Sequence, residues 1–174
     1  CRKIKSQRKM LKEYSYREKE LQSMAAVGRL AAYAHKAKRL LDIEALRGME
    51  GAASRVYFSS FGCLLDEGFW HWEGRAQHPA HDAVNALLNY GYAFLEKDVR
   101  IALAGSGLDV RLGFFHANNG RKDSLVYDMM EPYRHDVLDR LVLSLLRGGS
   151  FAPDDFSMGE EGCRLSPAAK KVWV

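Results

Sequence analysis

The sequence predicts an all-α fold, with a single helical bundle-like domain over residues 1–150 and an irregular segment over residues 151–174. Apolar residues recur at helical spacing along most of the chain, residues that cap helices precede several of these stretches, and glycines follow them. With 174 residues and 47% hydrophobic content, the chain is long enough to bury one substantial core. One helical domain is therefore the expected architecture.

The first third of the chain is expected to form consecutive helices. Apolar positions from Leu11 to Leu41 follow helical spacing and are rich in Ala and Leu, which predicts one long helix or two in succession. Asp42 is a suitable N-cap for the next helix, whose apolar residues run from Ile43 to Leu64 and which Gly68 is expected to end.

A loop and a long helix follow. Residues 68–82 contain two Gly, one Pro and two Trp without a steady period, which predicts an ordered loop with aromatic anchors. Asp82 is expected to cap a helix over residues 83–103, and Gly105 and Gly107 stand at its end.

The remaining elements are shorter. A polar turn over residues 117–123 is expected to carry His116 at its leading edge, and Ser124 is the predicted cap of the next helix. Pro132 either interrupts that helix or begins another, and apolar residues from 138 to 146 then form a helical stripe. The last segment is rich in Pro, Asp, Gly and Ser, which predicts irregular structure.

Composition argues against several classes of protein. The three cysteines include no Cys-x-x-Cys pair, so neither a disulfide framework nor a zinc knuckle is indicated, and a reducing, cytoplasmic setting is expected. The apolar runs are too short for a membrane span, so we expect a soluble protein with no membrane partner. The start at Cys1 suggests that an upstream domain is missing.

The net charge of +4 is concentrated at the start of the chain. Residues 1–20 hold eight Lys and Arg against three Glu, a local charge of +5, which leaves the remaining chain close to −1. Such a stretch is either a solvated helical face or a surface that contacts phosphates. One functional hypothesis is therefore a non-catalytic helical module that binds DNA through this basic segment.

Glu50 lies in line with the apolar stripe of its predicted helix. A buried carboxylate without a partner would cost several kcal/mol, so such a Glu usually meets a metal ion or a basic side chain. The alternative to a metal site is a structural ion pair with Arg55 or Arg134.

Asp128 and Glu131 are three residues apart and project from the same side of a predicted helix, where they repel unless a cation lies nearby. His116 precedes this helix on a turn that can fold back over it. The alternatives are a solvated acidic face and a surface histidine. One imidazole nitrogen and two carboxylates would suit Mn²⁺ or Mg²⁺. A rival cluster, made less favourable by Pro79, comprises His71, Glu73, His78 and His81.

A series of motifs resembles the CRISPR-associated integrase that captures spacers, the larger of the two universal adaptation proteins. The matching stretches are KIKSQ (3–7), LRGMEGAASRVYF (46–58), Gly74-Arg75, DAVNALLNYGYAFLEKDV (82–99), GLDVRLGFFH (107–116), GRKDSLVYDMMEPYR (120–134) and VLDRLV (137–142). Their order and spacing together make the resemblance specific.

The resemblance implies a metal-dependent DNA endonuclease and integrase that joins a 3′-hydroxyl of spacer DNA to a phosphodiester of the CRISPR repeat. It implies that Glu50, His116 and Glu131 bind the metal, Mn²⁺ or Mg²⁺, and that Asp128 assists them. Six further residues are expected to contact DNA or to brace the site: Arg55, Tyr57, Arg75, Asn89, Ser124 and Arg134.

The resemblance also implies partners. Family members form homodimers and bind the smaller adaptation protein, partly through an N-terminal β-domain that is absent from this sequence. The basic start is then expected to be the remnant of a linker from that domain or from a fused upstream protein. The loop GRAQHPAHDA (74–83) holds less Arg and Pro than is usual in relatives, which implies a different grip on DNA.

Overall fold

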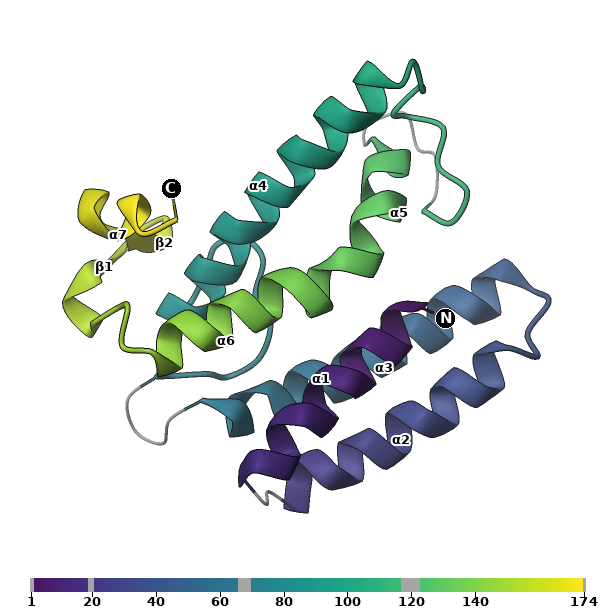
Figure 1. Cartoon of the computed structure of the whole chain (residues 1–174), viewed down its shortest axis with the longest axis horizontal. Coiled ribbons are helices and arrows are strands. Elements are labelled where there is room, and N and C mark those ends of the chain that lie inside the picture. The colour runs from purple at the N-terminus through teal and green to yellow at the C-terminus, as the bar shows by residue number, and fades with distance from the viewer. Residues whose placement is uncertain (1, 19–20, 66–69, 117–122, 174) are drawn as a thin grey trace.

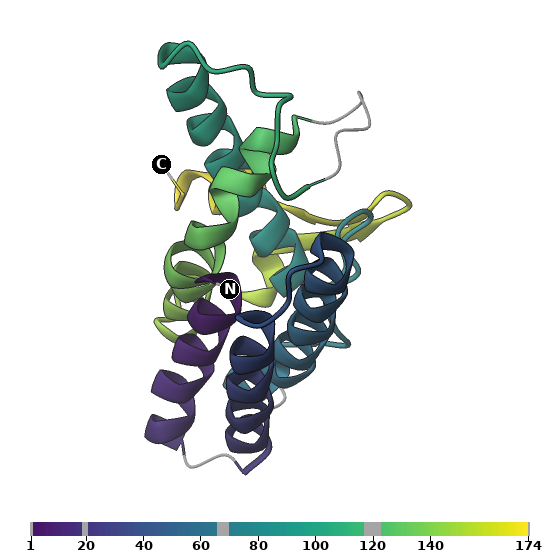
Figure 2. The same cartoon turned by 90° about the vertical axis from the view of Figure 1, so that its right-hand side faces the viewer.

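The computed structural model describes residues 2–18, 21–65, 70–116 and 123–173, and it consists of two groups of helices and one small hairpin. The first group packs α1, α2 and α3 against one another with roughly parallel axes (Figures 1 and 2). Their bounds are α1 (Arg2–Glu18), α2 (Leu21–Ala37) and α3 (Ile43–Phe61), the last continued by the 3₁₀ turn η1 (Gly62–Leu64). The predicted helices over the first 64 residues are confirmed.

The second group is built around the long helix α4 (Ala83–Gly105). It packs against α5 (Ser124–Tyr133), the π-helical segment η2 (Arg134–Asp139) and α6 (Arg140–Arg147). Because α1 contacts both α5 and η2, the two groups meet along the chain's first helix. The predicted all-α fold is confirmed, and no described helix is long and apolar enough to span a membrane.

Two of the three predicted helix caps are confirmed. An Asp42 carboxylate oxygen accepts a hydrogen bond from the Ala45 N–H at 2.7 Å, and Asp82 accepts one from the Asn85 N–H at 2.7 Å. These bonds satisfy backbone donors that the first helical turn cannot pair internally.

Ser124 was expected to cap α5, and this prediction is wrong. Ser124 is the first residue of the helix, and the cap position belongs to Asp123, whose side chain makes no capping bond. The Asp123 carboxylate instead forms an ion pair with Arg100 of α4. That tertiary contact competes with local capping and fixes the point at which the helix begins.

Pro132 lies inside α5 without ending it. Proline has no N–H to donate to the preceding turn, and the hydrogen-bonding pattern widens two residues later into η2. The chain then continues directly into α6, so these three elements form one bent helical rod (Figure 1).

The prediction of an irregular segment after residue 150 is wrong for the part that the structure describes. The 3₁₀ turn η3 (Pro153–Asp155) leads into strands β1 (Phe156–Gly159) and β2 (Gly162–Leu165), which pair antiparallel, and into α7 (Pro167–Lys171). Strands of four residues are too short for an alternating pattern to stand out. The Cys163 N–H donates to the Ala80 carbonyl oxygen at 2.8 Å, which ties the hairpin to the loop before α4.

The loop prediction before α4 is confirmed for residues 70–82, and Gly68 lies outside the described residues. Trp70 is buried against Phe156, with ring centroids 5.9 Å apart, and the Trp72 indole N–H donates to the Phe58 carbonyl oxygen at 3.0 Å. Both tryptophans therefore anchor the loop, as expected.

Candidate metal centre

Glu50 and Glu131 lie on either side of one cation, the ammonium group of Lys3. The Lys3 Nζ contacts the Glu50 carboxylate and lies 2.8 Å from Oε2 of Glu131. The three side chains come from α3, α5 and the first turn of α1, and each is less than a fifth exposed. Helix packing therefore brings together two of the predicted metal ligands, which are 81 positions apart in the chain.

The pKa of Glu131 lies below its ordinary value. Burial alone would raise that pKa, but the positive charges of Lys3 and Arg134 outweigh the burial. An Arg134 Nη1 donates to Oε1 of Glu131 at 2.8 Å, so each carboxylate oxygen faces a cation. Glu131 is therefore ionised at neutral pH and suited to bind a positive ligand.

Asp128 anchors the segment that precedes α5. Its buried carboxylate accepts hydrogen bonds from the backbone N–H groups of Phe114, Phe115 and His116 at 2.6, 2.9 and 2.9 Å. Burial alone would raise the pKa of Asp128. The three backbone hydrogen bonds and the bond to the His116 ring outweigh the burial and hold this pKa below its ordinary value. Gly113 permits the close approach, since a Cβ there would lie 2.5 Å from the Ser124 Cβ.

His116 is held by the same carboxylate. Its Nδ1 lies 2.6 Å from Oδ1 of Asp128, and its side chain is 36% exposed. A carboxylate at Nδ1 favours the tautomer with the proton on that nitrogen, which leaves Nε2 with a lone pair for a metal. The structure therefore assigns Asp128 the task of orienting the histidine ring.

The predicted ligands thus occur as two neighbouring pairs. Glu50 and Glu131 share Lys3, while His116 and Asp128 share a hydrogen bond, and the pairs are linked because Asp128 and Glu131 lie one turn apart on α5. Within the described ranges, no three His, Cys, Asp or Glu side chains are close enough to hold an ion together. The joint site of Glu50, His116 and Glu131 therefore stays a prediction.

A cavity of about 430 Å³ adjoins both pairs. Its lining includes Lys3, Glu50, Asp128 and Glu131, with the aromatic ring of Phe115 as part of its apolar wall. Such a volume can accept a hydrated ion and a phosphate group. Oxygen and imidazole donors are the chemistry that Mn²⁺ accepts, and Mg²⁺ prefers the oxygens.

Three of the predicted supporting residues, Arg55, Arg75 and Arg134, line a second cavity beside this site, and Asn89 holds one of them. Arg134 joins both, since it bonds Glu131 and its guanidinium lies 4.6 Å from the ring centroid of Tyr92. Arg75 donates to the side-chain oxygen of Asn89 at 2.7 Å, so this pair fastens the loop to α4. Arg55 is exposed and borders the second cavity, which Lys3, Arg75 and Arg134 also line.

The other two supporting residues are buried. The hydroxyl of Tyr57 donates to Oδ2 of Asp139 at 2.8 Å, deep in the core. Ser124 is 1% exposed and borders a cavity with His116. Tyr57 therefore braces the interior and is not placed to touch DNA.

Arg55 and Arg134 were the expected ion-pair partners of Glu50. The partner that the structure shows is Lys3. The side chain of Lys3 could have been found from the periodicity of α1. Positions 3, 7, 10 and 14 share one face of a helix, and Gln7, Met10 and Tyr14 are buried there. Lys3 was instead grouped with the basic residues of the segment.

A buried polar cluster centred on Asp139 was also missed. His135 Nδ1 lies 2.6 Å from Oδ2 of Asp139, and the hydroxyls of Tyr57 and Tyr92 both donate to this carboxylate. The i, i+4 spacing of His135 and Asp139 on an otherwise apolar face was the available signal.

The rival histidine cluster does not assemble in the described part of the chain. His71 pairs with Glu73 at 3.2 Å, but both side chains are mostly exposed. His78 and His81 are exposed as well, and they lie in a loop that contains a cis His78–Pro79 peptide bond. The polar turn over residues 117–122 lies outside the described residues.

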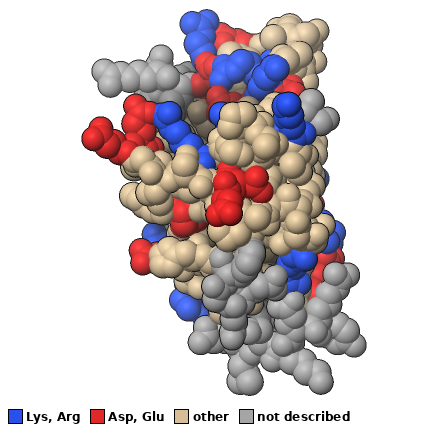
Figure 3. All heavy atoms as spheres, turned by 90° about the vertical axis from the view of Figure 1, so that its left-hand side faces the viewer, with Lys and Arg blue, Asp and Glu red and all other residues tan. Residues whose placement is uncertain are grey.

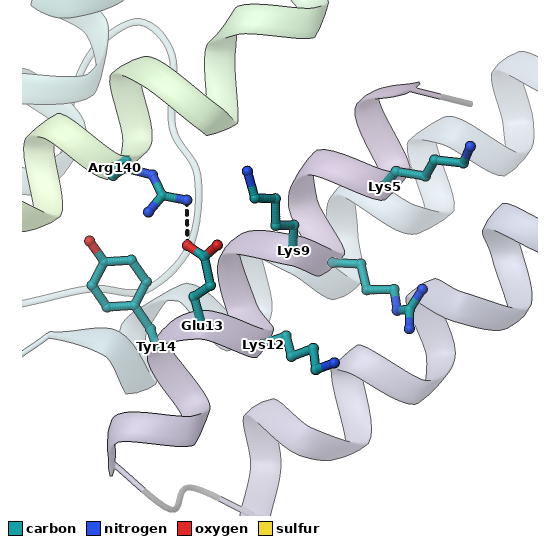
Figure 4. Close-up of a pocket in the computed structure, with 7 residues that line it drawn as sticks. Lys5, Lys9, Lys12, Glu13, Tyr14 and Arg140 are labelled. Carbon is teal, nitrogen blue, oxygen red and sulfur yellow. Dashed lines mark ion pairs between the residues drawn. The ribbon is translucent and has the colours of Figure 1, made fainter.

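Most of the basic side chains of α1 line a groove of about 570 Å³ between this helix and Arg140 of α6 (Figure 4). Lys5, Arg8, Lys9 and Lys12 border it, and Glu13 forms an ion pair with Arg140 at 2.5 Å. On the face that carries the hairpin, by contrast, acidic side chains lie near the centre as well as toward the edges, interspersed with basic and uncharged ones (Figure 3). Positive charge therefore gathers on the α1 side.

Comparisons with known proteins agree with this architecture. The family profile described as CRISPR associated protein Cas1 matches residues 1–174. A CRISPR-associated endonuclease Cas1 of Methanospirillum hungatei is 40% identical over 140 residues, which cover 80% of this chain and 42% of that protein.

Two solved structures have the same fold. A chain of a partial Cas6-RT-Cas1–Cas2 complex superimposes with a TM-score of 0.85 and 28% identity, covering 99% of this chain and 52% of that one. A casposase bound to integration product gives a TM-score of 0.75 and 28% identity, with 99% and 47% covered. The chain spans about half, or less, of these relatives, and since the profile matches throughout, it belongs to the Cas1 family of CRISPR-associated proteins.

Proposed function

We propose that this chain carries the metal-binding catalytic centre of a DNA endonuclease and integrase that inserts spacer DNA into a CRISPR array. The observation that carries the proposal is the cation position between Glu50 and Glu131, beside an oriented histidine. A similar solved protein is bound to an integration product, and others assemble with Cas2. We accordingly propose three partners for this chain: a second copy of itself, Cas2, and DNA in the form of spacer ends and the CRISPR repeat.

The residues present fit a divalent ion. Oε2 of Glu131 is buried and accepts no hydrogen bond within the described residues, where its ion-pair partner is the Lys3 ammonium. Glu50, Glu131 and Nε2 of His116 would hold Mn²⁺ or Mg²⁺. A bound ion of this kind offsets the negative charge that develops on phosphate oxygens during strand transfer.

The chain's own groups perform the other tasks. Asp128 fixes the ring of His116 and keeps its proton on Nδ1, while Arg134 holds Glu131 in one rotamer. The apolar wall formed by Phe115 excludes water from part of the cavity, and the Phe115 carbonyl oxygen accepts a hydrogen bond from Arg47 Nε at 2.7 Å. These contacts position the reacting groups before DNA arrives.

Calorimetric titration with Mn²⁺ tests the proposal. The unaltered chain should bind Mn²⁺, and Glu131→Gln should weaken binding at least tenfold, because it removes a charged ligand but keeps the shape. Glu44→Gln is the matched control, since Glu44 lies on α3 with a side chain that is 71% exposed. Absence of Mn²⁺ binding, or equal affinity in all three proteins, would contradict the metal centre.

A second function, DNA binding without catalysis, is favoured by the basic groove of α1. We expect the charge reversals Lys5→Glu, Arg8→Glu and Lys12→Glu together to weaken DNA binding and to reduce its salt dependence. Each lost phosphate contact lowers the slope of log K against log salt by about 0.9. Fluorescence anisotropy at several salt concentrations measures both quantities.

The control reverses three exposed cations, Lys36 in the last turn of α2 and Lys38 and Arg39 just after it, which changes the net charge equally. An equal loss in both triple variants would show a general charge effect and contradict a specific groove. If the groove variant abolishes DNA binding while alanine at Glu50 and Glu131 leaves every function intact, the non-catalytic reading is correct.

A further inference from the structure

Lys3 is a buried cation with two carboxylate partners. Its side chain is 15% exposed, it contacts Glu50, and its Nζ lies 2.8 Å from Oε2 of Glu131. Its neighbour Ile4 is 1% exposed, so the first turn of α1 is packed into the protein and not frayed into solvent. An ammonium group in such a place is stable only while its partners are ionised and close.

The charges at this site already balance. The carboxylates of Glu50 and Glu131 face the cations of Lys3 and Arg134, two negative groups against two positive ones. A divalent ion bound to the same oxygens would lie within a few ångströms of the Lys3 ammonium. Like charges repel at such a distance, so a bound divalent ion would disfavour the ammonium in the same place.

The Lys3 ammonium has a second position open to it. Its side chain also borders the neighbouring cavity of about 430 Å³, whose lining offers the carboxylate of Glu73 and the hydroxyls of Ser54 and Ser59 besides its arginines. A lysine has a flexible four-carbon stem, so a change of rotamer can carry the ammonium out of the carboxylate pair while α1 stays in place.

From these contacts we infer that Lys3 is a built-in counter-ion that holds Glu50 and Glu131 together in the metal-free protein and competes with the metal for them. The inference rests on the proposed function. It adds that metal affinity is set by a displaceable side chain as well as by the ligands, and that the metal-free site is kept in shape without an ion.

The test compares Lys3→Met with Lys36→Met in the whole chain, because methionine keeps much of the stem and removes the charge. Lys36 is exposed on α2, outside the proposed metal site and the basic groove, and is the matched control. Calorimetry should show that Lys3→Met binds Mn²⁺ at least tenfold more tightly than the unaltered protein, while Lys36→Met binds as the unaltered protein does. In EDTA, Lys3→Met should melt at a lower temperature, and saturating Mn²⁺ should raise its Tm by more than that of the unaltered chain.

Equal or weaker Mn²⁺ binding by Lys3→Met, with normal binding by the unaltered chain, overturns this inference and leaves the proposed function standing. Failure of every protein to bind Mn²⁺ overturns both. If Lys3→Met does not fold, amine acetylation of the unaltered chain decides: Lys3 should become more reactive when Mg²⁺ saturates the protein, with Lys36 unchanged. Equal protection of Lys3 with and without Mg²⁺ overturns the inference.

Discussion

Replacing Glu131 with alanine is expected to slow the proposed metal-dependent cleavage and joining of DNA by about 10³-fold. The substitution removes a buried, ionised carboxylate that faces the proposed cation position. Lewis-acid assistance contributes several kcal/mol to phosphoryl transfer, and about 4 kcal/mol corresponds to a thousandfold change in rate. Gel assays of branched DNA substrates in Mn²⁺ measure the rates.

The control for this variant is Glu44→Ala, which removes an exposed carboxylate from the adjoining helix and should leave the rate unchanged. The substitution also releases Arg134 from its ion pair. Circular dichroism is therefore used to check that the Glu131 variant is folded. A Glu131→Ala protein that is folded and as fast as the unaltered chain would rule out this residue as a metal ligand.

The helices could be predicted from the sequence wherever the signal is local. Asp42 and Asp82 cap their helices through bonds that span three residues, and such bonds depend on the local chain alone. Ser124 satisfied the same sequence rule but was overridden by the pairing of Asp123 with Arg100, 23 positions away. Capping rules therefore fail where a distant charge claims the cap residue.

The candidate site shows the same division between local signals, which the sequence reveals, and distant contacts, which it does not. Periodicity placed Glu50 on a buried face, and spacing placed Asp128 and Glu131 one turn apart. Periodicity also places Lys3 on the buried face of α1, but it could not predict which carboxylates this lysine meets, since Glu50 lies 47 positions away. The packing of α1 against α3 and α5 brings Lys3 to both carboxylates.

The buried cluster around Asp139 supplies the largest expected effect on stability. Asp139 is fully buried, and its carboxylate accepts hydrogen bonds from Tyr57 and Tyr92 and pairs with His135. Alanine would leave these three groups without their partner in the core. Each buried polar group left without its partner costs about 1–3 kcal/mol, so we expect a loss of about 3–5 kcal/mol for Asp139→Ala in urea unfolding at pH 7.

The same variant should change how stability depends on pH. Burial raises the pKa of Asp139, but the charge of His135 and the hydrogen bonds from His135, Tyr92 and Tyr57 outweigh it and hold the pKa below the ordinary value. A carboxyl whose pKa is lower in the folded than in the unfolded state stabilises the fold above the unfolded pKa, about 3.9. That contribution is lost as the pH falls through the folded pKa, so the gap between Asp139→Ala and the unaltered chain should be full at pH 7 and narrow below pH 4.

The matched control is Asp98→Ala, which removes an exposed carboxylate from α4 and should change the free energy of unfolding by less than about 0.5 kcal/mol. A loss at Asp139 as small as that at Asp98 would mean that the four side chains can separate without cost. A large loss that stays constant down to acid pH would instead show that Asp139 acts through its shape, and that its charge contributes nothing to the stability of the core.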